Sequence, residues 1–314
     1  MSAERILELC DSWCSIVKMA DNSLGICGES EKYRLLINGI QFHDLDSISL
    51  KAAVVGLSKV MLLPGLNSVV VQDHYFLWSW CAELILNRDA NVFDVNEYEL
   101  RTLFGTCVRA SLAGYVKPAK SFEESQQIFN RNETMSHNEK YFVQESSLVL
   151  AYLVFPLLEG TCKKLCSSYI TMGGDVLQPF VVPCPKGGDK KYNPNGKIGK
   201  GRCSSLRDLL YLTSSLYKSS ELELLKDHIK QFGDGNDAFD VIYNWRNQSL
   251  HGTTSFQTIG GTLLNLVMFL LLSQLGGDFE KVRSETLEQC CRNYQSEYRS
   301  SRSFYPPYEC YQIV

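Results

Sequence analysis

Residue types that can cleave a phosphodiester lie close together in the segment RNQSLH, residues 246–251. Arg246 offers a planar, permanently charged set of donors to a phosphate, and His251 can take or give a proton near neutral pH. In RNA the ribose 2′-hydroxyl is itself the nucleophile, so the protein need only move protons and stabilise charge. The segment therefore predicts metal-independent RNA cleavage, with Arg246, Asn247 and His251 as catalytic residues and no cofactor.

The spacing within this segment leaves several arrangements open. Arg246 and His251 are five residues apart, which places them about 140° apart around an ideal helix. Either the arginine bends back, or the last turn loosens near Gly252, or the arginine of one subunit meets the histidine of another. A simpler alternative is that His251 only stabilises a helix C-terminus by complementing its dipole. The similar spacing in RNETMSH, residues 131–137, falls in a polar segment that we interpret as a linker.

The composition is that of a folded protein, since 45% of the 314 residues are apolar and 21% are charged. The formal net charge of −4 means that any nucleic-acid site must be local. The N-terminus lacks the pattern of a signal peptide. The most apolar run, residues 262–275, is shorter than the ~20 residues that span a bilayer, so we interpret it as a buried helix flanked by Gly260-Gly261 and Gly276-Gly277. These features predict a cytoplasmic protein without a membrane segment.

The chain has 12 cysteines, and none of them forms a C-x-x-C pair. Two pairs have the i,i+4 spacing of one helix face, but no histidine or further cysteine pair lies beside them. A zinc site and a disulfide framework are therefore both disfavoured. We expect reduced, buried thiols and no bound metal.

Apolar residues recur at helical spacing through most of the chain. Residues 33–42 are the exception: this patch is strand-like and carries a turn signal at Asn38-Gly39. The polar segment 117–138 suggests a domain boundary. Helices are expected at 3–19, 47–63 with Ser47 as N-cap, 73–86, 95–115, 145–166 with a possible kink at Pro156, 206–218, 221–231, 237–250, 254–275 and 278–298.

The second half of the chain resembles the HEPN superfamily, over about residues 141–300. The resemblance is carried by Arg246, Asn247 and His251 at the end of an apolar helix, and by a long first helix, residues 148–166, with Glu159 late in it. It implies a metal-independent endoribonuclease whose catalytic residues are Arg246 and His251, with Asn247 in support. It also implies a homodimer in which two motifs form one cleft. The long insertion after the first helix and Pro156 depart from the family pattern, and some members only bind RNA or a partner.

A basic, glycine-rich insertion, residues 184–203, separates the first two helices of this bundle. It holds six basic residues and one acidic residue, a local charge of +5. Such an insertion suits a flap that follows an RNA backbone, and a solvated loop is the alternative. Tyr192 is a candidate for stacking on a base, and a hairpin is expected across Gly173-Gly174-Asp175. The candidate RNA-binding residues are Lys190, Lys191, Lys197, Lys200 and Arg202.

Together these features predict a mainly all-α protein with three parts. Residues 1–138 form a mostly helical N-terminal domain of unknown role, residues 139–300 a HEPN-like bundle with a basic loop or hairpin insertion, and residues 301–314 a tail. The expected function is RNA cleavage, with a role in defence by analogy with the family. A regulatory protein partner is possible. The alternative is a non-catalytic helical module that binds RNA or a protein.

Overall fold

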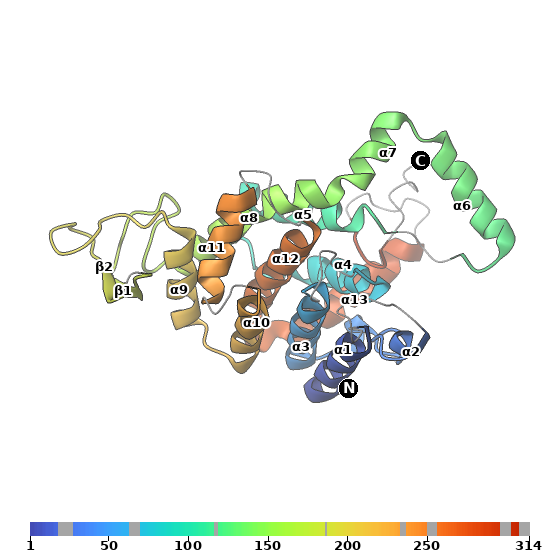
Figure 1. Cartoon of the computed structure of the whole chain (residues 1–314), viewed down its shortest axis with the longest axis horizontal. Helices are drawn as coiled ribbons and strands as arrows, with labels where there is room; N and C mark the ends of the chain where they lie inside the picture. Colours follow the sequence, from blue (N-terminus) through green and yellow to red (C-terminus); the bar gives the residue numbers. More distant parts are fainter. Residues whose placement is uncertain are drawn as a thin grey trace.

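The chain is mainly helical, which confirms the predicted fold class. The computed structural model describes residues 1–17, 28–62, 70–115, 119–185, 187–232, 237–249, 256–295 and 303–307. Figure 1 shows a central group of packed helices, with a small strand pair at one end and helix α6 projecting at the other. The helices are α1 (Ala3–Val17), α2 (Gly28–Glu31), α3 (Ser47–Met61), α4 (Gln72–Leu86), α5 (Tyr98–Leu112), α6 (Phe122–Thr134), α7 (His137–Gln144), α8 (Ser146–Leu165), α9 (Leu206–Leu216), α10 (Ser220–Lys230), α11 (Ala238–Ser249), α12 (Phe256–Leu272) and α13 (Phe279–Gln295).

Helix α12 lies at the centre of the fold. Every residue from 258 to 272 is buried, as its predominantly apolar sequence predicts. It packs against α8 and also against α3, α4 and α5. Gly260 and Gly261 precede the apolar run 262–275, and both lie inside the helix, as the expected helical range 254–275 implies. A Cβ atom at Gly260 would lie 3.0 Å from Leu150 Cγ and 3.2 Å from the backbone nitrogen of Ala151, so the glycine lets α8 approach closely.

The N-terminal half contributes α1, α3, α4 and α5 to the same core. Helix α3 begins one residue after Asp46, whose carboxylate accepts a hydrogen bond from the Ser49 backbone N–H at 2.7 Å. The predicted N-cap, Ser47, is therefore wrong by one residue. The hydrogen bond lowers the pKa of Asp46, because it favours the ionised carboxylate.

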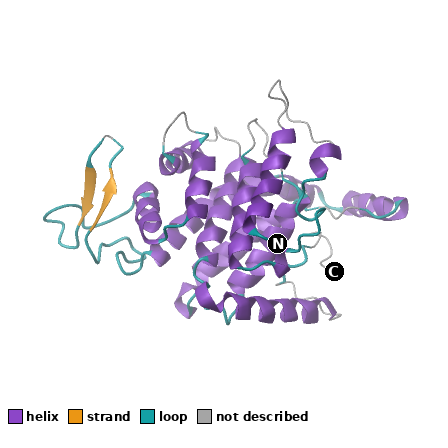
Figure 2. Ribbon diagram, turned by 90° about the horizontal axis from the view of Figure 1, so that it is seen from below, coloured by secondary structure: helices purple, strands orange, loops and turns teal. Residues whose placement is uncertain are grey.

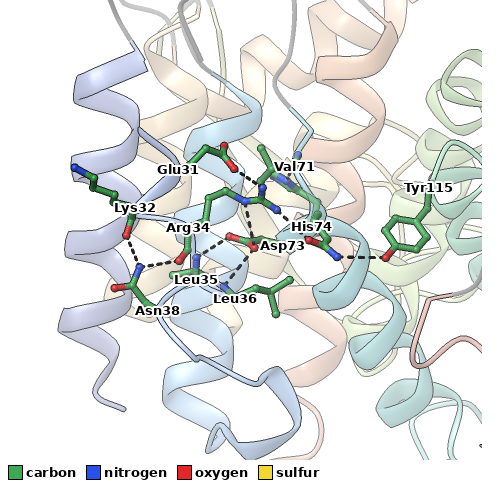
Figure 3. Close-up of polar contacts among 11 residues, drawn as sticks. Glu31, Lys32, Arg34, Leu35, Leu36, Asn38, Val71, Asp73, His74 and Tyr115 are labelled. Atoms are coloured by element: carbon green, nitrogen blue, oxygen red, sulfur yellow. Dashed lines mark hydrogen bonds and ion pairs between the residues drawn. The ribbon is translucent and has the colours of Figure 1, made fainter. Parts of the chain in front are cut away.

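Residues 33–42 form turns and not the expected strand. The Asp73 carboxylate, at the start of α4, accepts the backbone N–H of Leu35 at 2.7 Å and that of Leu36 at 3.4 Å (Figure 3). The Asn38 side chain donates to the backbone carbonyls of Lys32 and Arg34 (Figure 3). These side chains occupy the backbone groups that a strand would pair, so the patch folds as a turn.

The insertion contains a strand pair, although not where the sequence predicts it. Strands β1 (Phe180–Pro183) and β2 (Asp189–Tyr192) pair antiparallel. The segment around Gly174, at φ +92°, forms two isolated antiparallel bridges, between Ile170 and Val176 and between Asp175 and Arg202. Figure 2 shows the strand pair at one edge of the molecule, outside the group of helices.

The expected domain boundary at residue 138 falls within α7. The polar segment before it, interpreted as a linker, is largely helical, as α6. Buried residues from both sides of residue 138 belong to one hydrophobic cluster. The division into two domains stays a prediction, but the described residues of both halves share one core.

Among the described helices, none is by itself long and apolar enough to cross a bilayer. Two neighbouring pairs reach that length and composition only when they are joined, and the pairs are bent by 53° and 94°.

The close approach at Gly260 generates a prediction about stability. The substitution Gly260→Leu is expected to lower the free energy of unfolding by about 1–3 kcal/mol, because the added side chain must displace α8. Urea denaturation followed by circular dichroism measures this. Gly277→Leu is the control, since a Cβ there meets nothing within 4 Å. Equal unfolding midpoints for the two variants would contradict the prediction.

Candidate functional site

Helix α11 carries the candidate catalytic segment. Its first turn is fixed by Asp237, whose carboxylate accepts the backbone N–H of Phe239 at 2.8 Å. Its buried residues recur at helical spacing and face α9, α10 and α8. They are Ala238, Phe239, Val241, Ile242, Trp245 and Ser249.

Arg246 and Asn247 lie in the last turn of α11, away from its most buried face. The Arg246 side chain is 36% exposed, and Asn247 is half-buried. The Arg246 guanidinium lies 3.8 Å from the Glu159 carboxylate of α8, which is long for a salt bridge. Glu159 makes a shorter ion pair, 2.8 Å, with Lys163. Glu159, which the sequence places late in the first bundle helix, therefore faces the candidate motif.

The end of α11 is fixed against α8 by a second contact. The Tyr152 hydroxyl donates to the backbone carbonyl of Ser249 at 2.9 Å. His251 lies outside the described residues, so its geometry relative to Arg246 stays a prediction.

The basic insertion is anchored to α9 through a buried carboxylate. Asp208, 2% exposed, forms an ion pair with Lys190 and accepts a hydrogen bond from the Tyr192 hydroxyl at 2.6 Å. Tyr192 is buried and its ring stacks on Phe180, with 4.6 Å between centroids. Its expected role in stacking on a base is therefore wrong, because the ring is buried and contacts Phe180 and Lys190.

The five candidate RNA-binding residues divide into two groups. Lys190 and Arg202 have structural contacts: Lys190 with Asp208, and Arg202 with the Gly173 carbonyl at 2.9 Å. Lys191, Lys197 and Lys200 are exposed, and none of them forms a salt bridge with a described carboxylate. These three lysines are the part of the insertion that is available to an anion.

Arg207 connects the insertion to α11. Its guanidinium donates to the Pro183 carbonyl of β1 at 2.5 Å and forms an ion pair with Asp240 of α11. It also lies over the Tyr211 ring, 4.5 Å from the centroid. Helix α9 separates the strand pair from α11 in Figure 1, and packs against both. The structure thus links the two predicted RNA-contacting regions through α9.

The histidines include two buried residues that the sequence did not identify as such. His74 of α4 accepts the Val71 backbone N–H through Nδ1 at 3.1 Å and contacts the Leu57 carbonyl through Nε2 at 3.0 Å. Burial lowers the pKa of His74 to about 4. His228 of α10 is 5% exposed, and burial lowers its pKa to about 4 as well.

The cysteines are largely buried, as expected. Eight of the ten described cysteines are buried, and all ten are free thiols. Burial raises the pKa of Cys162 to about 12 and that of Cys166 to about 11, so neither is a thiolate at neutral pH. Within the described ranges, no three histidine, cysteine or carboxylate side chains gather closely enough to hold a metal ion.

Comparisons of the chain with protein-family models, with curated proteins and with solved structures found no match.

Burial of His74 generates a prediction about acid stability. In the unfolded chain the histidine titrates near its ordinary pKa of 6.5, whereas in the folded protein it stays neutral down to about pH 4. Its contribution to stability is therefore fully present above pH 6.5 and is lost as the pH falls toward 4. The free energy of unfolding of the wild type, relative to His74→Gln, is expected to fall by about 3 kcal/mol over that range.

Urea titrations at several pH values measure this difference. The raised pKa of the neighbouring Asp73 favours the folded state as the pH falls, which opposes the effect of His74. Because Asp73 is present in both proteins, its effect is common to the two free energies that are compared. His137→Gln, on an exposed part of α7, is the matched control and should parallel the wild type. A difference between wild type and His74→Gln that is independent of pH would contradict the prediction.

Proposed function

We propose that this protein is a metal-independent endoribonuclease whose reaction centre is formed by Arg246, Asn247 and His251. The proposal rests on one observation, the partial exposure and the weak ion pairing of Arg246. Its guanidinium is partly exposed at the end of α11, and its nearest described carboxylate, Glu159, is 3.8 Å away. An arginine held this loosely is free to bind a phosphate, whereas the buried Arg207 is fully engaged in structural contacts.

The proposed reaction uses only the substrate and these side chains. His251 removes the proton of the ribose 2′-hydroxyl, whose oxygen then attacks the adjacent phosphorus. The new bond joins the 2′-oxygen to phosphorus, and the bond from phosphorus to the 5′-oxygen breaks. The leaving 5′-oxygen takes up a proton from water and His251 returns its proton to solvent, so the products are a 2′,3′-cyclic phosphate and a 5′-hydroxyl. Arg246 stabilises the negative charge on the phosphate oxygens, and Asn247 orients the phosphate or the histidine.

Glu159 acts in this scheme as a positioning residue. It holds the guanidinium of Arg246 over the end of α11 until a phosphate replaces it as the closest anion. Lys163, which shares Glu159, keeps the carboxylate partly neutralised after the exchange.

The wider proposal follows the HEPN resemblance. Two chains form a homodimer through the helical bundle, so that Arg246 of one subunit meets His251 of another. Lys191, Lys197 and Lys200 follow the RNA backbone. The protein acts in the cytoplasm, in a defence or toxin-like response that a protein partner controls. The alternative is a module that binds RNA or a protein and cleaves nothing.

The first test of this proposal is RNA cleavage in EDTA. Wild-type protein is expected to cleave a mixed single-stranded RNA. His251→Ala and Arg246→Ala are each expected to reduce the rate by about 100-fold or more, because general acid–base catalysis and charge stabilisation each contribute at least that much. Arg292→Ala, an exposed arginine on α13, is the control and should keep full activity.

Circular dichroism and urea midpoints must match among these proteins for the rates to be compared. Wild-type cleavage that persists in both active-site variants would reject the assigned residues. Absence of cleavage by the wild type, together with intact RNA binding, would favour the binding module.

The exposed lysines of the insertion lead to a second prediction. Replacing Lys191, Lys197 and Lys200 by alanine is expected to reduce the salt dependence of RNA affinity, measured as log K against log salt, by about 2 in slope. Fluorescence anisotropy with labelled RNA at several salt concentrations measures the slope. Replacing Lys120 and Lys281, which are exposed elsewhere, should leave it unchanged. An unchanged slope in the triple variant would place the RNA on another surface.

A further inference from the structure

A polar cavity lies between α4, α5 and α13, away from the strand pair and α11. Its volume is about 740 Å³, within the range of small-molecule sites. Two side-chain hydrogen bonds join the elements around it. Asn87 donates to the Thr286 hydroxyl at 2.6 Å, and Asn293 donates to the Ser303 hydroxyl at 2.9 Å. The first joins the end of α4 to α13, and the second joins α13 to the described segment 303–307.

Three arginines line this cavity. Arg88 follows α4, and Arg101 and Arg109 lie on α5. Arg101 donates to the Leu86 carbonyl at 2.7 Å, and Arg109 lies over the Phe304 ring, 4.9 Å from the centroid. None of the three forms a salt bridge with a described carboxylate. Each guanidinium therefore retains donors for a ligand.

A glycine also lines the cavity. Gly105 lies between Arg101 and Arg109 on one face of α5, at i+4 from each. A Cβ atom there would lie 3.3 Å from Nη1 of Arg109 and 4.0 Å from the Phe304 ring. Any larger side chain at this position would fill the space between the two arginines.

Two carboxylates also line the cavity, Glu83 and Asp89. The Glu83 carboxylate is engaged within the protein, since it accepts hydrogen bonds from the backbone N–H groups of Phe304 and Tyr305. Burial raises its pKa, and the two backbone hydrogen bonds act in the opposite direction. Asp89 is exposed. The positive groups therefore outnumber the negative ones.

The spacing of the arginines indicates an extended anion and not a single phosphate. Arg101 and Arg109 are two helical turns apart, about 12 Å along the axis of α5. A chain of phosphates joined to a nucleoside covers such a distance. Tyr98, 69% exposed, lies at the same cavity and offers a ring for a base to stack on.

We infer that this cavity binds a nucleoside polyphosphate, with Arg88, Arg101 and Arg109 on the phosphates and Tyr98 against the base. Bidentate donation from arginine suits phosphate oxygens, and Gly105 leaves room for them. The inference uses none of the residues proposed for RNA cleavage.

Isothermal titration calorimetry in EDTA tests this inference, with ATP, pyrophosphate and adenosine as probes. ATP is expected to bind saturably to the full chain, and pyrophosphate and adenosine at least about tenfold more weakly, because each makes only part of the contacts. The double variant Arg101→Ala/Arg109→Ala and the variant Gly105→Leu are each expected to weaken ATP binding by about tenfold or more.

The controls are Arg292→Ala, exposed and outside the cavity, and His251→Ala. Both should bind ATP as the wild type does, so that a failure of RNA cleavage and a failure of this site are distinguishable. Variants are compared only where their urea midpoints match, and the double variant serves if Gly105→Leu does not fold. ATP binding that survives in both cavity variants, or pyrophosphate binding as tight as that of ATP, would overturn the inference.

Discussion

Helix α12 is apolar around its whole circumference, and the rest of the fold must surround it. A helix of this kind is stable in water only if other elements cover every side. Helices α3, α4 and α5 come from the N-terminal half of the chain, and α8 comes from the other half. Thr258, Thr262 and Asn265 are buried polar residues of α12, and Asn265 bonds to both neighbouring helices. It accepts from the Trp78 indole N–H at 2.6 Å and donates to the Ser58 hydroxyl at 2.9 Å, so it fixes the angular position of α12 against α3 and α4.

Much of this arrangement could be predicted from the sequence, because it depends on local periodicity. The helices α8, α11 and α12 each follow the expected ranges to within a few residues. The turn at Asn38-Gly39 was expected, but the absence of a strand in residues 33–42 could not be predicted, because Asp73, which binds their backbone, is distant in the sequence. The helical state of α6 was missed for a different reason: none of its described side chains is buried, so no core-facing apolar stripe marks it.

The candidate sites were predictable to different degrees. Arg246 and Asn247 were predicted from their residue types and their spacing in the sequence. Glu159 was identified through the family resemblance. The structural roles of Lys190 and Arg202 were hidden, because Asp208 and Gly173 meet them only in the folded chain. The arginines at 101 and 109 share a helix face with Gly105 in the sequence, but the cavity also needs α13 and Phe304, which are distant in the sequence.

Helix α6 has a thermodynamic consequence for the whole molecule. It is held mainly by local contacts: Ser121 caps its N-terminus and Gln126 donates to Asn130 at 3.0 Å. A helix of 13 residues without tertiary packing is marginal in water. Opening of α6 therefore exposes little apolar surface and leaves the cluster around α12 intact. Amide hydrogens of α6 will exchange with solvent through this local opening, while those of α12 exchange only when the molecule unfolds cooperatively.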